Sequence, residues 1–309
     1  CDQARKLIAG LCGRTDLDIH FLIGGTQTNF TVIAAALRPH QCVLCADTGH
    51  INVHESGAVE ACGHKVSAIP SPDGKLTARQ IEEAWHAHWD DETREHMPQP
   101  RMVYISQPTE LGTIYSRKEL QEISGVCRRR GLYLYMDGAR LGYGLCDEDN
   151  DLDLPAIASL CDAFYIGGTK VGALFGEALV LRHEALKEDF RYIAKQKGGR
   201  LAKGRLLGIQ FLELFRDGLY FRLGAHADRL AVMLRDFCRS RGLALPFSSG
   251  TNQQFVTMPD SVLEELGRKY GFAYLRREDE THSTVRFCTS WATREEDVRE
   301  LMADIARLC

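Results

Sequence analysis

Short apolar runs rich in β-branched residues alternate with longer stretches of helical periodicity through the first two thirds of the chain. Runs of this kind predict strands that are buried on both faces, and the stretches between them predict the covering helices. The expected strands are Ile19–Ile23, Cys42–Ala46, Lys65–Ile69, Arg101–Ser106, Leu132–Met136, Ala163–Ile166 and Glu177–Leu181. The expected helices are Thr28–Leu37, Thr77–Trp89, Arg117–Arg130 and Glu184–Lys195. The pattern therefore predicts an α/β fold with a mostly parallel, seven-stranded sheet between helices.

The pattern changes after residue 200. Two long helical stretches come first, Leu201–Phe215 and Phe221–Arg241, and then short strands near Gln254–Thr257 and Thr284–Cys288 and a helix from Thr293. This order is typical of a smaller α+β domain, so we expect a large domain at residues 1–218 and a small C-terminal domain at 219–309. The chain opens directly into a helical pattern, and we expect that a longer polypeptide continues before it.

Composition narrows the class of protein. The net charge of −4 offers no basic excess for nucleic-acid phosphates, and no apolar run approaches the ~20 residues that span a membrane. The eleven cysteines are scattered through apolar runs, which favours reduced thiols in a reducing compartment such as the cytoplasm. We therefore expect a small molecule as the partner.

The segment from Ile23 to Asn29 reads Ile-Gly-Gly-Thr-Gln-Thr-Asn, follows a predicted strand and opens a predicted helix. Its glycines permit a tight turn, and the free N–H groups of the helix start favour an anion, with the Thr26 hydroxyl as a further donor. The motif is neither GxGxxG nor a P-loop. A plain strand–helix turn is the alternative to a phosphate site.

A carboxylate, Asp137, ends the predicted strand Leu132–Met136, where open α/β sheets bind ligands. Such a buried carboxylate requires a donor or a cation, and a protonated pyridine nitrogen is one such partner. Arg140 is placed to offer its guanidinium to a carboxylate or phenolate in the same cleft. A structural Asp–Arg pair is the alternative.

Lys170 follows another predicted strand, within a run of small residues. The glycines around it are Gly167, Gly168, Gly172 and Gly176. They allow a bulky group to approach the backbone, and desolvation would lower the pKa of the lysine and make it a nucleophilic amine. A solvated lysine is the alternative.

A pair of histidines, a basic run and a late arginine are further candidates for a role in the site. His50 and His54 have a spacing that suits a metal on a helix, but without HExxH or a third ligand we prefer stacking of an imidazole on an aromatic cofactor. The run from Gln196 to Arg205 concentrates four cations, Lys203 among them, and a solvated linker explains it equally well. Arg286 lies between apolar strand residues and requires an anion, either a substrate carboxylate or a structural one.

From Asp18 to Trp291, the order of these motifs resembles the low-specificity L-threonine aldolases, within the aromatic amino acid β-eliminating lyase/threonine aldolase group. The carrying elements are Gly-Gly-Thr-Gln-Thr-Asn, a His, Asp-Gly-Ala-Arg, Thr-Lys among glycines and a late Arg. The resemblance implies the aspartate-aminotransferase fold (pyridoxal-phosphate fold type I), pyridoxal 5′-phosphate as cofactor, and a homodimer or homotetramer with shared active sites.

The resemblance also implies a role for each residue. Lys170 would hold the cofactor as a Schiff base, Asp137 would pair with the pyridinium nitrogen, and His50 would stack on the ring. The other implied cofactor-binding residues are Gly25, Thr26, Gln27, Arg140, Thr169 and Lys203, the last reaching a neighbouring subunit. Arg140 and Arg286 would bind the substrate carboxylate.

The implied reaction is retro-aldol cleavage of a threonine-like or allo-threonine-like β-hydroxy-α-amino acid to glycine and an aldehyde, with His50 reaching toward the β-hydroxyl. A β-eliminating lyase or another fold type I lyase stays an alternative, and a non-catalytic oligomeric scaffold is an alternative of another class. Thr109 stands near the position where threonine aldolases often carry a His. The family's N-terminal Ser-Asp-Asn segment has no counterpart.

Overall fold

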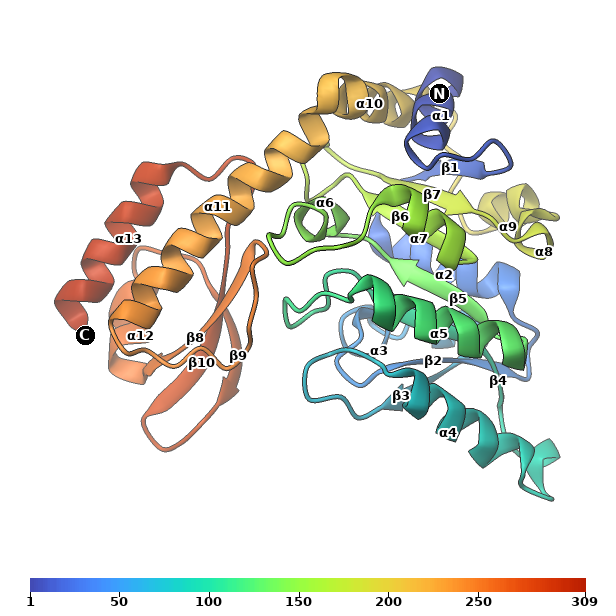
Figure 1. Ribbon diagram of the computed structural model, residues 1–309, viewed down its shortest axis with the longest axis horizontal. Helices are drawn as coiled ribbons and strands as arrows, with labels where there is room; N and C mark the ends of the chain where they lie inside the picture. Colours follow the sequence, from blue (N-terminus) through green and yellow to red (C-terminus); the bar gives the residue numbers. More distant parts are fainter.

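The computed structural model describes residues 1–309, and its larger part is built on a sheet with the strand order β1-β7-β6-β5-β4-β2-β3 (Figure 1). The strands are β1 (Asp18–Leu22), β2 (Gln41–Ala46), β3 (Lys65–Ile69), β4 (Gln99–Ser106), β5 (Tyr133–Asp137), β6 (Ala163–Gly167) and β7 (Glu177–Leu181). Only β7 runs against its neighbours, β1 and β6, and all the other pairs are parallel. The predicted mostly parallel, seven-stranded sheet is confirmed.

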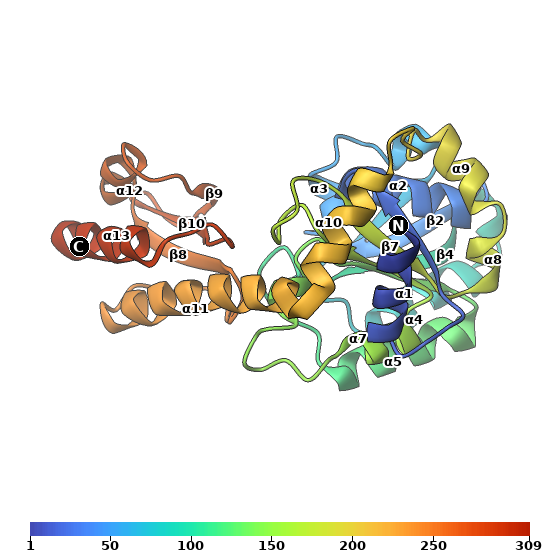
Figure 2. The ribbon, with the colours of Figure 1, turned by 90° about the horizontal axis from the view of Figure 1, so that it is seen from above.

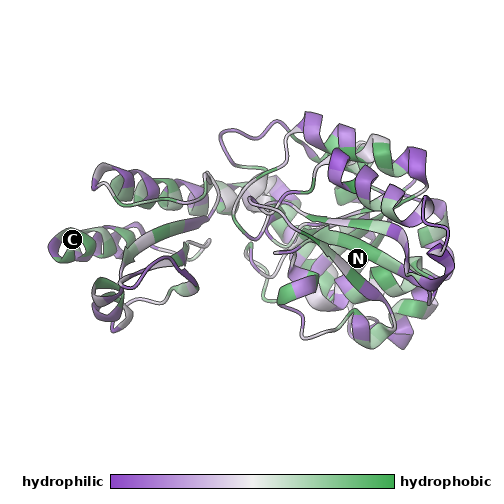
Figure 3. Ribbon diagram, turned by 90° about the horizontal axis from the view of Figure 1, so that it is seen from below, coloured by the Kyte–Doolittle hydropathy of each residue, from purple (hydrophilic) through white to green (hydrophobic).

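Helices cover both faces of this sheet, as Figures 1 and 2 show. They include α1 (Asp2–Leu11), α2 (Gly25–Ala36), α4 (Ala78–Trp89), α5 (Arg117–Arg130), α7 (Leu154–Leu160) and α10 (Arg205–Phe215). Successive residues of β5 belong to different cores: Leu134 and Met136 pack on one face and Tyr135 on the other. Burial on both faces explains why the central strands of the sheet are mostly hydrophobic, as the green ribbon in Figure 3 shows.

Local signals fix where two of the predicted helices begin. Thr77 and Ser116 each accept a hydrogen bond from the backbone N–H three residues later, which completes the capping boxes of α4 and α5. Helix α5 ends at Gly131, whose φ of 65° is a left-handed conformation that glycine adopts without strain.

Elsewhere the structure differs from the periodicity. The helix expected at Glu184–Lys195 is two helices, α8 (Glu184–Lys187) and α9 (Phe190–Gln196), because Asp189 between them has a φ of 55°. Five α-helices and strands were not expected: the helices α3 (His50–Val53), α6 (Leu141–Gly144), α7 and α12 (Asp260–Gly267), and the strand β9 (Ala273–Arg277). Strand β9 is exposed at nearly every position, so it carries no apolar signal.

The smaller part is a three-stranded antiparallel sheet of order β8-β10-β9, in which β8 is Gln253–Pro259 and β10 is His282–Cys288. Helices α11 (Leu219–Ser240), α12 and α13 (Glu295–Leu308) pack against it around a separate core. Helix α11 runs from the large sheet to the small one (Figure 1). We propose the domain division at residues 218 and 219, where this helix begins.

Helix α11 also contacts the larger part directly. A Cβ atom on Gly224 would lie 2.5 Å from the carbonyl oxygen of Gly142 in α6, so only glycine permits this approach. The contact holds the small sheet against the edge of the large one at which β5 and β6 end. None of the helices is both long and apolar enough to cross a membrane.

Candidate functional site

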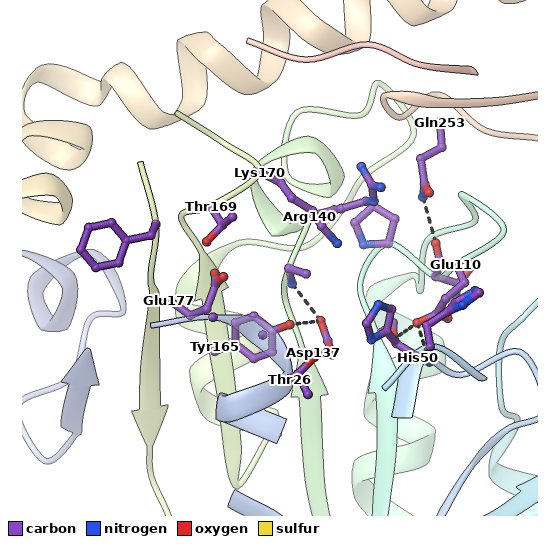
Figure 4. A pocket seen from close by; sticks show the side chains of 18 of the residues that line it. Thr26, His50, Glu110, Asp137, Arg140, Tyr165, Thr169, Lys170, Glu177 and Gln253 are labelled. Carbon is purple, nitrogen blue, oxygen red and sulfur yellow. Dashed lines mark hydrogen bonds between the residues drawn. The ribbon is translucent and has the colours of Figure 1, made fainter. Parts of the chain in front are cut away.

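A cavity of about 420 Å³ lies at the edge of the large sheet where β4, β5 and β6 end (Figure 4). It brings together most of the site residues predicted from the sequence. Those that line it are Gly25, Thr26, His50, Asp137, Arg140, Thr169, Lys170 and Arg286. Because Arg286 and Gln253 come from the small sheet, both parts of the molecule form the site.

Two predicted cofactor ligands do not line the cavity. The side-chain amide of Gln27 accepts the Ile23 N–H at 3.2 Å and donates to the Lys197 carbonyl at 3.2 Å. These bonds direct it to the segment after α9 rather than to the cofactor position. Lys203 is exposed before the start of α10, outside its own chain's cavity.

The Gly-Gly-Thr loop carries the chain from β1 into α2. Gly24 is the residue before the helix and no side chain caps it, so the first N–H groups of α2 are free for an anion. Gly25 passes close to the neighbouring strand, because a Cβ there would lie 3.0 Å from the Tyr165 hydroxyl. Thr26 and Thr169 line the cavity beside this helix start.

The Asp137 carboxylate is 4% exposed and accepts four hydrogen bonds. Its Oδ2 atom accepts from Asn29 Nδ2 at 2.9 Å and from the Tyr104 hydroxyl at 2.7 Å. Its Oδ1 atom accepts from the Ala139 N–H at 2.9 Å and from the Tyr165 hydroxyl. No cation forms a salt bridge with Asp137, so a protonated ring nitrogen would supply the missing positive charge.

Close backbone contact brings Lys170 to the same cavity as Asp137. A Cβ on Gly138 would lie 1.9 Å from the Tyr165 carbonyl oxygen, and one on Gly167 would lie 2.2 Å from that of Ala139. Only glycine therefore allows the chain after β5 to pass the end of β6.

The electrostatic setting of Lys170 favours an unprotonated amine. Burial lowers the pKa of Lys170, and the nearby Arg140 guanidinium lowers it further. The negative charges of Asp137, Glu177 and Glu110 oppose this effect without reversing it. An amine that loses its proton more readily is a better nucleophile toward an aldehyde.

The two histidines of the cavity have opposite electrostatic settings. Burial alone would lower the pKa of His50, but its hydrogen bond to Glu55 at 2.8 Å and the charge of Asp137 outweigh burial and raise it. The pKa of His54 is lowered, by burial first and then by the positive charges of His50, Arg286 and Lys170. His50 therefore tends to keep its proton, and His54 tends to be neutral.

The guanidinium groups of Arg140 and Arg286 are only partly satisfied. Arg286 Nη1 donates to Gln253 Oε1 at 3.1 Å, while its buried Nε has no hydrogen-bond partner. Arg140 Nη1 has a long contact of 3.4 Å with Asn252 Oδ1. An unpaired buried donor is costly, so this end of the cavity is suited to a carboxylate.

Several residues around the cavity were not singled out from the sequence. Asn29 donates to Glu55 at 2.7 Å as well as to Asp137, and so links the His50–Glu55 pair to the Asp137 carboxylate. Glu110 and Glu177 line the cavity too. Asn29 belongs to the segment Ile23–Asn29, so its position one turn into α2 could have indicated from the sequence that it lies near the cavity. No sequence pattern indicated the positions of Glu110 and Glu177.

Comparison with known proteins identifies the family. The model of the Beta-eliminating lyase family matches residues 6–261. The chain belongs to the beta-eliminating lyase family. Proteins of this family and of the aspartate-aminotransferase fold use pyridoxal 5′-phosphate. The cavity fits that group, since it offers a free helix start for the phosphate, a carboxylate without a salt-bridge partner for the ring nitrogen, and an amine of lowered pKa.

Two relatives of this chain are low specificity L-threonine aldolases. The chain is 35% identical to the low specificity L-threonine aldolase of Pseudomonas sp. (strain NCIMB 10558), over 98% of this chain and 85% of the relative. It is 34% identical to the enzyme of the same name from Pseudomonas aeruginosa, over 94% of this chain and 83% of the relative. The predicted resemblance to threonine aldolases is confirmed.

Solved structures agree as well. A threonine aldolase of Leishmania major superposes with a TM-score of 0.96 and 44% identity, over 100% of this chain and 89% of that one. An aspartate aminotransferase of Thermus thermophilus, which is 16% identical, superposes with a TM-score of 0.71 over 99% of this chain and 81% of that one. The predicted aspartate-aminotransferase fold is therefore confirmed.

Proposed function

We propose that the protein cleaves a β-hydroxy-α-amino acid of the threonine or allo-threonine type to glycine and an aldehyde, with pyridoxal 5′-phosphate as cofactor. One observation carries the proposal: Lys170, Asp137 and the unsatisfied Arg286 line a single cavity. The names of the Pseudomonas and Leishmania relatives support the choice of substrate.

When bound, the cofactor supplies an aldehyde that condenses with amines and a ring that accepts electrons from a bond broken at Cα. Lys170 provides the amine of the resting enzyme. The helix start at Gly25, with Thr26 and Thr169, would hold the phosphate, and the Asp137 carboxylate would favour the protonated form of the ring nitrogen. His50 would pack against the ring, and its hydrogen bond to Glu55 favours the protonated imidazole.

Arg286 and Arg140 would hold the substrate carboxylate and so fix the orientation of the amino acid at Cα. As the Cα–Cβ bond breaks, the β-hydroxyl loses its proton and its oxygen becomes the carbonyl of the aldehyde. His54 suits this proton because a neutral imidazole can accept one, whereas the raised pKa of His50 makes that ring a poorer acceptor. A proton returned to Cα completes glycine.

Thr109 does not replace the histidine that threonine aldolases often carry nearby. Thr109 lines the cavity, but its hydroxyl is engaged with the Thr113 hydroxyl at 2.7 Å, and a threonine hydroxyl is a poor proton acceptor. The position of His54 on the cavity wall supports it as the proton acceptor instead.

We further propose a homodimer or homotetramer in which Lys203 contacts the cofactor phosphate of a neighbouring subunit. Its exposed position outside its own cavity supports this role. A cytoplasmic location is proposed as well, because all eleven cysteines are free thiols and such thiols persist in reducing compartments.

The decisive experiment offers L-threonine, L-allo-threonine and an aromatic β-hydroxy amino acid to the yellow holoenzyme and identifies the products. Glycine with the matching aldehyde is expected, and Lys170→Ala serves as the inactive control. Pyruvate and ammonia from a serine-like substrate, with no glycine from threonine, would move the protein to the eliminating lyases. A colourless, inactive chain would favour the non-catalytic scaffold.

A further inference from the structure

Glu177 is the first residue of β7, the strand that runs against its neighbours in the large sheet. Its register pairs it with Leu22, at the end of β1, and with Gly167, at the end of β6. Both partners lead directly into cavity loops, residues 23–26 after β1 and 168–170 after β6. Glu177 therefore lies between the two segments proposed to hold the cofactor phosphate.

The Glu177 side chain faces the cavity rather than the core. The residue is 3% exposed, and its Oε2 atom accepts a hydrogen bond from the Gly168 N–H at 2.9 Å. Figure 4 shows it beside Thr169, and no salt bridge joins it to a cation. Burial raises the pKa of Glu177 to about 7, although hydrogen bonds from Thr169 and Gly168 favour the ionised form.

We propose that Glu177 binds the cofactor phosphate in its protonated form and donates a hydrogen bond to a phosphate oxygen. An ionised carboxylate at this place would repel the phosphate dianion inside a poorly solvated pocket. Binding of the phosphate is therefore coupled to the uptake of one proton by Glu177. The inference rests on the cofactor site of the proposed function and is independent of which substrate bond is cleaved.

Other titratable groups lie close enough to Glu177 to interact with its charge. They are Asp137 and Tyr135 of β5, Tyr165 of β6, Lys170 after β6 and Tyr220 of α11. Burial raises the pKa of each tyrosine well above its usual range, so the three hydroxyls stay neutral. Because Lys170 condenses with an aldehyde, the probe must carry the phosphate and ring without one.

The coupling predicts how affinity depends on pH. Above a pKa of about 7 the free protein must take up a proton before it binds the phosphate, so affinity falls about tenfold per pH unit. Glu177→Gln keeps the shape and a hydrogen-bond donor but cannot ionise. From pH 6 to pH 9 the wild-type affinity should therefore fall about 100-fold relative to that of Glu177→Gln.

The test is titration calorimetry of the cofactor-free full chain with pyridoxine 5′-phosphate at pH 8, in buffers of different ionisation enthalpy. Wild type should take up close to one proton more than Glu177→Gln, since the probe's own ionisation is common to both. Glu110→Gln is the matched control: it removes another cavity carboxyl, next to His50, and should keep the wild-type uptake.

An infrared difference spectrum of wild type, with and without the probe, tests the same point if Glu177→Gln does not fold. A protonated carboxylic acid band should appear on binding. Equal proton uptake in wild type and Glu177→Gln, or no such band, would overturn the role of Glu177 alone. A wild-type chain that neither binds the probe nor turns yellow with pyridoxal phosphate would overturn the cofactor site and this inference together.

Discussion

Asp137→Asn replaces the carboxylate proposed for the ring nitrogen with a neutral amide of the same size. The amide oxygen must stay on the side of the Ala139 N–H, because a backbone donor cannot turn into an acceptor. The new NH₂ group then faces Tyr104 and Asn29, which both donate to Asp137 Oδ2 in the wild type. Tyr104 can rotate its hydroxyl and accept a hydrogen bond from the amide.

Asn29 has no such freedom. To accept from the new amide it must turn its own amide, and it then loses the 2.7 Å bond that it donates to Glu55. A hydrogen bond to a charged group contributes ~1.5–3 kcal/mol, so the free energy of unfolding should fall by up to about that amount. The chain should still fold, because the packing around Asp137 is unchanged in volume.

The effect on turnover should be larger than the effect on stability. A neutral amide no longer favours the protonated ring nitrogen, so the ring accepts electrons from Cα less readily. Loss of one preorganised electrostatic contact at a reacting group costs ~10²–10³-fold in kcat, and we expect a fall in this range.

The assay measures aldehyde release from L-threonine, the absorbance of the bound cofactor and urea unfolding on the same preparations. Asp162→Asn is the matched control, since Asp162 is another buried carboxylate that accepts a backbone N–H, from Leu134 at 2.9 Å, and it lies outside the cavity. It should lose stability and keep kcat. Wild-type turnover in Asp137→Asn would refute the placement of the ring nitrogen at this carboxylate.

Three further expectations follow from the site. Borohydride reduction of the holoenzyme and peptide mapping should label Lys170, and label on Lys195 or Lys203 instead would overturn the site. His54→Phe should lower kcat by ~10²–10⁴-fold. In the wild type, kcat should fall below the ordinary histidine pKa of 6.5, because activity is lost as His54 gains its proton, and this acid limb should be missing in His54→Phe. A pH profile of kcat that is the same in both would exclude His54 as the proton acceptor, and His50→Phe is measured for comparison. Lys203→Ala should weaken cofactor binding, and mixing it with Lys170→Ala protomers should restore part of the activity, whereas a monomer with full cofactor affinity would disprove the shared site.

The large sheet was predictable from the sequence for a physical reason. Parallel strands covered on both faces are continuous apolar runs, so β2, β4 and β6 stand out from the helical stretches between them. Strand β9 gave no such signal because it is an exposed edge strand. The break between α8 and α9 depends on one backbone angle, at Asp189, which the apolar period does not record.

In the candidate site, too, local patterns indicated some residues, while contacts between distant parts of the chain determine the others. Asp137 ends β5, and Thr26 and Lys170 come shortly after the ends of β1 and β6. Strands that run in the same direction place such residues at one edge of the sheet. The direction of Gln27 depends on a carbonyl group 170 residues later in the chain, so no local pattern contains it. The different electrostatic settings of His50 and His54 likewise arise from distant groups, among them Asp137 and Arg286.

Glu177 shows why strand direction matters as much as strand position. In a parallel strand the residues that face the site come at the carboxyl end, and a search of the sequence looks there. Strand β7 is antiparallel, so its first residue lies at the edge where β1 and β6 end. A glutamate that begins a strand resembles an ordinary solvated residue, yet this direction places Glu177 between the two proposed phosphate-binding segments. A site built on a mixed sheet therefore has two sets of candidate residues, those that follow its parallel strands and those that begin its antiparallel ones.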